Sequence, residues 1–337
     1  KKGKMFILVD NKDRENEGDL VVPASKANPK KINFMAKHGR GLICLALTSK
    51  KVKKLNLPLM SLINKSRTQT AFTVSIESKK GISTGISAYD RAKTVKVAIK
   101  PSSTKKDIVS PGHVFPLVAK NGGVLERAGH TEASVDISKL AKLNPSAVIC
   151  EVMNEDGTMA RYKDLIPFAK KHRLKIAKIE DLISYRLKNE IFVRCISSKK
   201  IKIKNFGNFD LKTFKNKLDG SEHYAITKGK FNSSKASRVR VISTNILNSF
   251  FNLNKNIFKN TLKHLIRFNS FALILIKGTN PNPTSSEKSN ILRYYGVGAQ
   301  IIKELKIKNM ILVSRSKKRV IALKGYGIKI TKQEIIK

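Results

Sequence analysis

The chain has 337 residues, of which 41% are hydrophobic, and its 68 Lys and Arg residues exceed its 24 Asp and Glu residues to give a formal net charge of +44. This length allows two domains of ordinary size, each with its own core. The longest apolar runs, such as Phe271–Ile276, are much shorter than the ~20 residues that span a bilayer, so no membrane segment is expected.

The first part of the chain contains patterns of strands and helices in alternation. Strands are predicted at Lys4–Val9, Gly41–Leu47, Ala71–Glu77 and Ser146–Val152, and helices at Pro29–His38 and Leu165–His172. Such alternation is typical of the α/β and α+β classes.

A helical pattern at Ile179–Arg186 is followed by a Lys188–Asn189 break, so we expect one domain at residues 1–186 and a second at residues 187–337. The second domain contains predicted strands at Ile191–Ile196, Tyr224–Thr227, Arg238–Ser243, Phe271–Ile276 and Met310–Ser314, and a predicted helix at Ala299–Leu305.

The positive charge has two interpretations. A basic chain can bind nucleic acid through its phosphates. Here, however, Lys predominates, often in pairs such as Lys30–Lys31, and the chain has no Trp for base stacking. We therefore expect most of this charge to be solvated surface, and we do not expect a nucleic-acid partner.

Three widely spaced cysteines, Cys44, Cys150 and Cys195, form no Cys-x-x-Cys motif. They predict neither a disulfide framework nor a cysteine zinc site, and they indicate a reducing, cytoplasmic setting. The chain begins without Met or a signal-peptide pattern and enters the first predicted strand at once, so we expect a leading segment before it.

Acidic residues are scarce in this chain but concentrated in Asp13–Asp19, where Asp13, Glu15, Glu17 and Asp19 alternate with other residues. An extended chain would place them on one face, whereas Gly18 indicates a turn that would converge them differently. The segment is either a solvated loop paired with surface Lys or a set of oxygen ligands for a hard cation, with Arg14 free to bind a phosphate.

A second group combines histidine with glycine-rich backbone, at Pro111–Pro116 and Gly122–Glu132. Gly-rich turns let amide N–H groups approach a phosphate, and Arg127 and Thr131 would add donors. His113 is a candidate proton carrier and His130 a candidate metal ligand, although histidines beside glycine are also common as structural turn residues.

Glu151 directly follows the predicted buried strand. A carboxylate at such a position can have a raised pKa that suits a general base, or it can simply be the first solvated residue after the strand.

These segments together resemble the 3,4-dihydroxy-2-butanone 4-phosphate synthase family of riboflavin biosynthesis. The similar motifs, in order, are Asp13–Asp19, Gly41–Leu45, Thr84–Arg91, Pro111–Pro116, Arg127–Ala133 and Cys150–Glu151. The resemblance covers residues 4 to 186 and implies an α/β sandwich there within a two-domain α+β protein.

The resemblance also implies a reaction, the conversion of D-ribulose 5-phosphate to formate and 3,4-dihydroxy-2-butanone 4-phosphate with Mg²⁺ or Mn²⁺ in a homodimer whose active site lies near the interface. It assigns Glu15 and His130 as metal ligands, and His113 and Glu151 as catalytic residues, with Glu17 in the same acidic loop. Substrate-binding positions are Arg14, Glu15, Asp19, Arg127, Ala128, Gly129, His130, Thr131 and Glu151.

The second domain resembles GTP cyclohydrolase II at Gly220–Ala225, Arg293–Ile302 and Gly325–Gly327. That enzyme needs three zinc cysteines, and the corresponding stretch from Val241 to His264 has none. The acidic, glycine-rich GTP segment is replaced by Lys277–Pro283. Without thiolates no zinc-activated water is available, so we expect a degenerate domain that has lost cyclohydrolase activity and serves as structural support. The alternatives are a retained cyclohydrolase activity and a basic nucleotide- or RNA-binding module.

Overall fold

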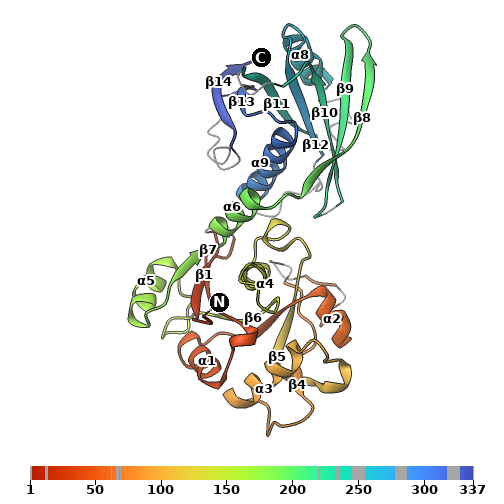
Figure 1. Ribbon diagram of the computed structural model, residues 1–337. Coiled ribbons are helices and arrows are strands. Elements are labelled where there is room, and N and C mark those ends of the chain that lie inside the picture. Colours follow the sequence, from red (N-terminus) through yellow and green to blue (C-terminus); the bar gives the residue numbers. More distant parts are fainter. Residues whose placement is uncertain are drawn as a thin grey trace. The chain divides into compact units, whose positions relative to one another are not determined.

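A computed structural model describes residues 2–11, 14–61, 63–65, 68, 70–218, 220–231, 235–244, 255–277, 287–316 and 327–336. The chain divides into two compact units, Lys1–Ile183 and Ser184–Lys337 (Figure 1). The division falls within α6 (Ile179–Asn189). This helix also contains residue 187, where the second domain was predicted to begin.

The first unit is built on a mixed seven-stranded sheet with the order β4-β5-β3-β6-β2-β1-β7. Its strands are β1 (Phe6–Val9), β2 (Gly18–Pro23), β3 (Cys44–Thr48), β4 (Ile76–Ser78), β5 (Ile108–Ala119), β6 (Ser146–Glu151) and β7 (Ile176–Lys178). The β3–β5 and β1–β7 pairs are parallel, and the other neighbours are antiparallel.

Helices cover both faces of this sheet. They are α1 (Pro29–Phe34, continued by a π-helical turn at Met35–Gly39), α2 (Ser49–Leu55), α3 (Ala88–Ile99), α4 (His130–Leu140) and α5 (Tyr162–Lys171). Because side chains alternate along a strand, Leu45 and Leu47 of β3 join the main core with residues of α1, α2, α3 and α5, whereas Ala46 packs with Val135 of α4. Helix α4 therefore covers the face opposite the main core.

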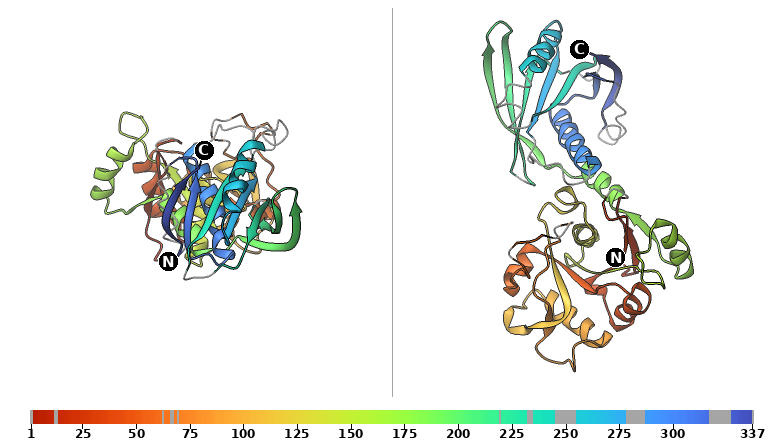
Figure 2. Two further views of the ribbon diagram at one scale, coloured as in Figure 1. Left: turned by 90° about the horizontal axis from the view of Figure 1, so that it is seen from above. Right: turned by 180° about the vertical axis from the view of Figure 1, so that it is seen from behind.

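The second unit has its own mixed seven-stranded sheet, with the order β14-β13-β11-β12-β10-β9-β8 (Figure 2). Its elements are β8 (Val193–Ile203), β9 (Gly207–Asn216), β10 (Glu222–Lys228), β11 (Ser237–Thr244), α8 (Lys255–Leu265), β12 (Phe271–Lys277), α9 (Glu287–Glu304), β13 (Asn309–Ser314) and β14 (Lys329–Ile335). Leu262 and Leu265 of α8 pack with Leu273, whereas Gly298 of α9 lies against Ile276 and Val241. The two helices thus cover opposite faces.

The predicted α+β class with two domains is confirmed. The strand predicted at Ala71–Glu77 is wrong in extent: only Ile76–Ser78 forms a strand, and Phe72 and Thr73 make isolated bridges. The helix predicted at Ala299–Leu305 is the end of the longer α9. Among the described residues, no helix combines the length and the apolar character needed to cross a membrane.

The main core of the first unit provides a stability test. Leu45 is fully buried, so Leu45→Ala should lower the free energy of unfolding by about 2–5 kcal/mol through lost transfer energy and a residual cavity. Leu140→Ala, at a 41% exposed side chain, should change it by less than about 0.5 kcal/mol. Native-state hydrogen exchange of β3 and β6 measures this unit separately, and equal protection in both variants would contradict the prediction.

Candidate active site

The acidic segment forms the loop between β1 and β2, closed by the pairing of Val9 with Gly18. Asp10, whose side chain is only 1% exposed, organises it: the Glu15 and Glu17 N–H groups donate to its carboxylate at 3.1 and 2.9 Å. Asn16 adopts a left-handed conformation with φ of 56°. The segment therefore turns, but at Arg14–Asn16 and not at Gly18, which begins β2. Asp13 lies outside the described residues.

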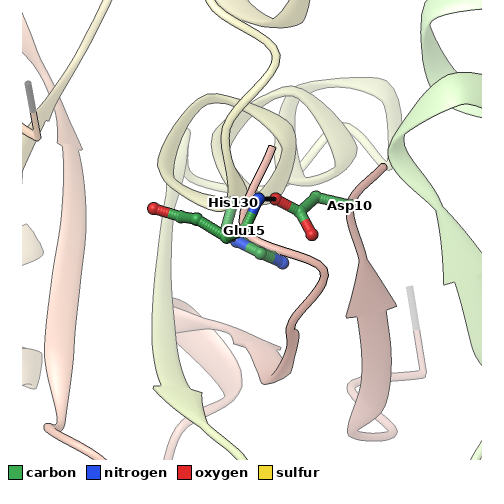
Figure 3. A group of neighbouring side chains, drawn as sticks. All are labelled: Asp10, Glu15 and His130. Atoms are coloured by element: carbon green, nitrogen blue, oxygen red, sulfur yellow. Dashed lines mark hydrogen bonds and ion pairs between the residues drawn. The ribbon is translucent and has the colours of Figure 1, made fainter. Parts of the chain in front are cut away.

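This loop meets the beginning of α4. His130 is buried, its Nδ1 lies 3.7 Å from Glu15 Oε2, and its Nε2 lies 3.8 Å from Asp19 Oδ1. Ligand atoms of Asp10, Glu15 and His130 all lie within 4.8 Å of one another (Figure 3). Residues that are far apart in the sequence thus form one cluster.

The cluster suits a divalent cation. The Nε2 atom of His130 is buried and has no hydrogen-bond partner among the residues that the structure describes, which is costly for a buried polar group. Carboxylate oxygens with one imidazole are a donor set that Mg²⁺ and Mn²⁺ accept. The residues present therefore fit such an ion.

The charges of the cluster are strongly coupled. Burial lowers the pKa of His130, but the charge of Asp19 and the hydrogen bond with Glu15 outweigh it and raise the pKa to about 9. Burial raises the pKa of Glu15, but His130 and Arg14 outweigh it and lower the pKa to about 2. Burial raises the pKa of Asp19 to about 7. At neutral pH the protonated imidazole of His130 thus provides the positive charge that balances these carboxylates. A bound cation would take over this role.

Glu151 lies beside this cluster at the end of β6. Asp19 pairs with Glu151 across the β2–β6 ladder, and both side chains point to the α4 face because Leu20 and Cys150 point to the main core. The Leu42 N–H donates to Glu151 Oε2 at 2.9 Å. A Cβ atom at Gly41 would lie 2.6 Å from the same oxygen, so only glycine at position 41 leaves room for this carboxylate.

His113 occupies β5, on the same sheet face, because Val114 points to the main core. Strand β3 separates β5 from β6, which places His113 and Glu151 about 10 Å apart across the sheet. His113 Nδ1 hydrogen-bonds Glu77 Oε1, and its side chain is 44% exposed. Among the described residues, no direct interaction joins His113 to the Glu15–His130 cluster.

The segment Arg127–Thr131 precedes and begins α4. Arg127 Nη1 donates to the buried Glu132 at 2.7 Å, and Nη2 donates to Thr70 Oγ1 at 2.8 Å. A side chain at Gly129 would collide with this Arg–Glu pair. The first-turn N–H groups of α4, with Thr131, form a helix N-terminus of the kind that binds phosphate, and Ala128 links them to Arg127.

Comparisons with known proteins agree with this architecture. Residues 1–185 match the family model of 3,4-dihydroxy-2-butanone 4-phosphate synthase, and residues 194–270 and 275–334 match that of GTP cyclohydrolase II. The chain belongs to the 3,4-dihydroxy-2-butanone 4-phosphate synthase family.

The chain is 42% identical over 366 residues to the riboflavin biosynthesis protein RibBA of Aquifex aeolicus, covering 100% of this chain and 90% of that one. Its structure is similar to the crystal structure of RibBX, a two-domain 3,4-dihydroxy-2-butanone 4-phosphate synthase from A. baumannii, with a TM-score of 0.86, 40% identity and coverage of 99% and 96%. A synthase crystallised with two magnesium ions is also similar, with a TM-score of 0.53, 37% identity and coverage of 56% of this chain and 92% of that one.

Three residues of this synthase-family site were missed by the sequence analysis. Asp10 directly follows β1 and precedes the acidic segment, and its position just after a buried strand was the available signal. Glu77 and Arg161 lie in segments whose patterns gave no indication of the site. Glu77 contacts His113 and Arg161 contacts the acidic loop, which only the folded sheet brings together.

Metal binding by this cluster can be measured directly. His130→Ala removes the imidazole and should weaken Mn²⁺ binding by more than about a hundredfold, beyond the loss caused by changing an outer partner. Titration followed by electron paramagnetic resonance measures the free Mn²⁺. His172→Ala is the control, because His172 lies in an aromatic cluster with Phe34 and Phe168 instead. Equal affinities of the two variants would contradict the site.

Proposed function

We propose that this protein converts D-ribulose 5-phosphate to formate and 3,4-dihydroxy-2-butanone 4-phosphate in riboflavin biosynthesis, in the cytoplasm and with Mg²⁺ or Mn²⁺. The observation that carries the proposal is the buried imidazole of His130 beside Glu15 and Asp19, in a chain of this family. The synthase crystallised with two magnesium ions supports the choice of metal. We assign the synthase activity to residues 1–186.

Glu15 and His130 would hold the cation, with Asp10 near enough to take part. A bound divalent cation polarises a carbonyl oxygen and so acidifies the neighbouring C–H group of a ketose. Asp10 additionally orders the loop by accepting its N–H groups, which keeps Glu15 directed at His130.

The substrate phosphate would bind to Arg127 and the N-terminal turn of α4, with Ala128, Gly129 and Thr131. The sugar hydroxyl groups would then face Arg14, Asp19 and Glu151. The Glu132 carboxylate and the Thr70 hydroxyl hold the Arg127 guanidinium in place for this role.

Proton transfers would be carried by Glu151 and His113, with Glu17 in the same loop as Glu15. The Leu42 N–H fixes one Glu151 oxygen, which leaves the other to exchange protons with the substrate. Glu77 hydrogen-bonds His113 Nδ1 and so directs its Nε2 away from β4. The reaction splits one pentulose phosphate into two products whose atoms sum to the substrate, so these residues need no oxidant or co-reactant.

We also propose a homodimer with the active site near its interface. Apolar side chains exposed beside the site support it: Leu42 is 40% exposed next to Glu151, and Val109 on the strand of His113 is 41% exposed. A second copy would cover both and exclude water from the proton carriers.

The synthase activity predicts formate release from ribulose 5-phosphate in the presence of Mg²⁺, abolished by EDTA and restored by added Mg²⁺. Glu151→Gln should lower kcat by about 10²–10⁴-fold, the usual contribution of a general acid–base group. Glu155→Gln is the matched control, because Glu155 is 87% exposed and pairs only with Arg40 among the described residues. Formate assayed enzymatically measures both, and absence of formate with Mg²⁺ present would refute the proposal.

For residues 187–337 we propose a degenerate domain without cyclohydrolase activity that serves as structural support. Of the three cysteines in the chain, Cys44 and Cys150 lie in the first unit, and Cys195 is exposed on β8. The single thiol of this domain cannot supply three zinc thiolates. Residues 245–254 of the stretch from Val241 to His264, and the segment Lys277–Pro283 after Lys277, lie outside the described residues, as do Gly325 and Tyr326.

Residual anion or nucleotide binding by this domain is the alternative, and Arg240 favours it. Arg240 is 7% exposed, and its Nη1 donates to the Val313 carbonyl at 3.2 Å. Within the described part of the chain its Nε has no hydrogen-bond partner. Burial and the nearby Arg315 lower its pKa. A buried cation of this kind is stabilised by an anion.

A single preparation distinguishes these possibilities. We expect no pyrimidine product from GTP and no stoichiometric zinc by metal analysis, while the same preparation releases formate from ribulose 5-phosphate. Zinc together with GTP turnover would show a retained cyclohydrolase. GTP binding without turnover that is lost in Arg240→Gln would support the nucleotide-binding alternative.

A further inference from the structure

We infer that Arg161 is a positioning residue that holds the acidic loop in its metal-binding conformation through the loop's carbonyl groups. The expected effect on metal affinity rests on the proposed function. The contacts of Arg161 with the loop do not depend on that function. Arg161 lies in the segment that leads into α5, far from the loop in sequence.

The contacts of Arg161 are directed at the loop backbone. Its Nη1 donates to the Glu15 carbonyl at 2.7 Å and to the Asn16 carbonyl at 2.9 Å. The same nitrogen lies 3.7 Å from Glu17 Oε1. Its own backbone N–H donates to Asp164 Oδ2 at 2.9 Å, which fixes the start of α5 and hence the origin of the side chain.

Asp10 and Arg161 hold complementary groups of the loop. Asp10 accepts the N–H groups of Glu15 and Glu17, whereas Arg161 binds the carbonyls of Glu15 and Asn16. The left-handed Asn16 between them is a conformation that costs energy for a non-glycine residue and persists only when its surroundings enforce it. The donor from α5 is suited to enforce it.

Packing against α5 supports only part of the loop. Leu165 of α5 lies close against Gly18, where the loop ends. A cavity of 360 Å³, whose lining includes Asp10, Asn16, Glu17 and Leu165, borders the rest of the loop. The hydrogen bonds of Arg161 to the Glu15 and Asn16 carbonyls add a polar connection between the loop and the start of α5.

The positive charge of Arg161 and its contacts with the loop should affect metal binding in opposite directions. A guanidinium close to a cation site repels the cation, so removal of Arg161 would strengthen metal binding if its charge alone mattered. Removal would weaken metal binding if the carbonyl contacts hold Glu15 toward His130. The sign of the change thus separates the two roles.

The experiment compares the full chain with Arg161→Gln and Arg161→Lys, using Mn²⁺ alone as the probe and electron paramagnetic resonance as the readout. Arg161→Gln should weaken Mn²⁺ binding by about ten- to a hundredfold, the range typical of lost outer-shell partners. Arg161→Lys keeps the positive charge but loses the planar guanidinium. Its affinity for Mn²⁺ should therefore lie between those of the wild type and of Arg161→Gln. Arg40→Gln is the matched control: Arg40 is 38% exposed, against 40% for Arg161, and also binds a carbonyl and a Glu.

Hydrogen exchange supplies a readout that does not depend on metal. The Glu15 and Glu17 amides should exchange faster in Arg161→Gln than in wild type or Arg40→Gln, while the β3 amides stay protected and show that the unit is folded. Unchanged loop exchange, or Mn²⁺ affinity equal to or higher than wild type, would overturn the inference. Faster loop exchange in a chain whose wild type binds no Mn²⁺ would uphold the positioning role and refute the metal site of the proposed function.

Discussion

The buried imidazole of His130 set against the carboxylates of the β1–β2 loop is the interaction on which the rest of the site depends. Each partner alone would be unfavourable in this place: the imidazole has a nitrogen without a hydrogen-bond partner among the described residues, and the carboxylates repel one another. Together their opposite charges stabilise one another, and their atoms form a donor set that suits a cation. Because α4 begins at His130, the same contact also directs the helix N-terminus, with its free N–H groups, toward the site.

The sheet gives the site its spacing. Asp19, Glu151 and His113 project from three strands onto the face covered by α4, while their neighbours along each strand fill the main core. Alternation of side chains therefore separates the site from the core: substitution of Leu20 or Val114 changes the core, and substitution of the residue before each of them, Asp19 or His113, changes the site. The segment Gly41–Leu42 adds a backbone donor for Glu151 that no side chain could replace.

Much of this site could be predicted from sequence because its ligands occur in short motifs with unusual composition. Acidic residues in a strongly basic chain, and histidines beside glycines, are visible without a structure. The contacts of Asp10, Glu77 and Arg161 were not predictable, because each depends on the pairing of strands or on a helix start distant in sequence. The strand predicted at Ala71–Glu77 was wrong in extent for a related reason. Alternation of apolar and polar residues indicates that a segment has a buried and an exposed face, but it does not reveal whether a partner strand lies beside the whole segment. The pattern of strands and helices indicated an α/β or α+β class, and the family resemblance narrowed this prediction to a two-domain α+β protein.

At the site, His130 at the start of α4 lies close to Glu15 of the β1–β2 loop and to Asp19 of β2. A cation held there would act as a removable crosslink between regions that the unfolded chain keeps far apart. Such a ligand stabilises the folded chain in proportion to the logarithm of its concentration once its binding is saturated. The resistance of the protein to heat and to proteases would then depend on the magnesium concentration around it. A cell short of magnesium would therefore lose folded protein in addition to catalytic activity.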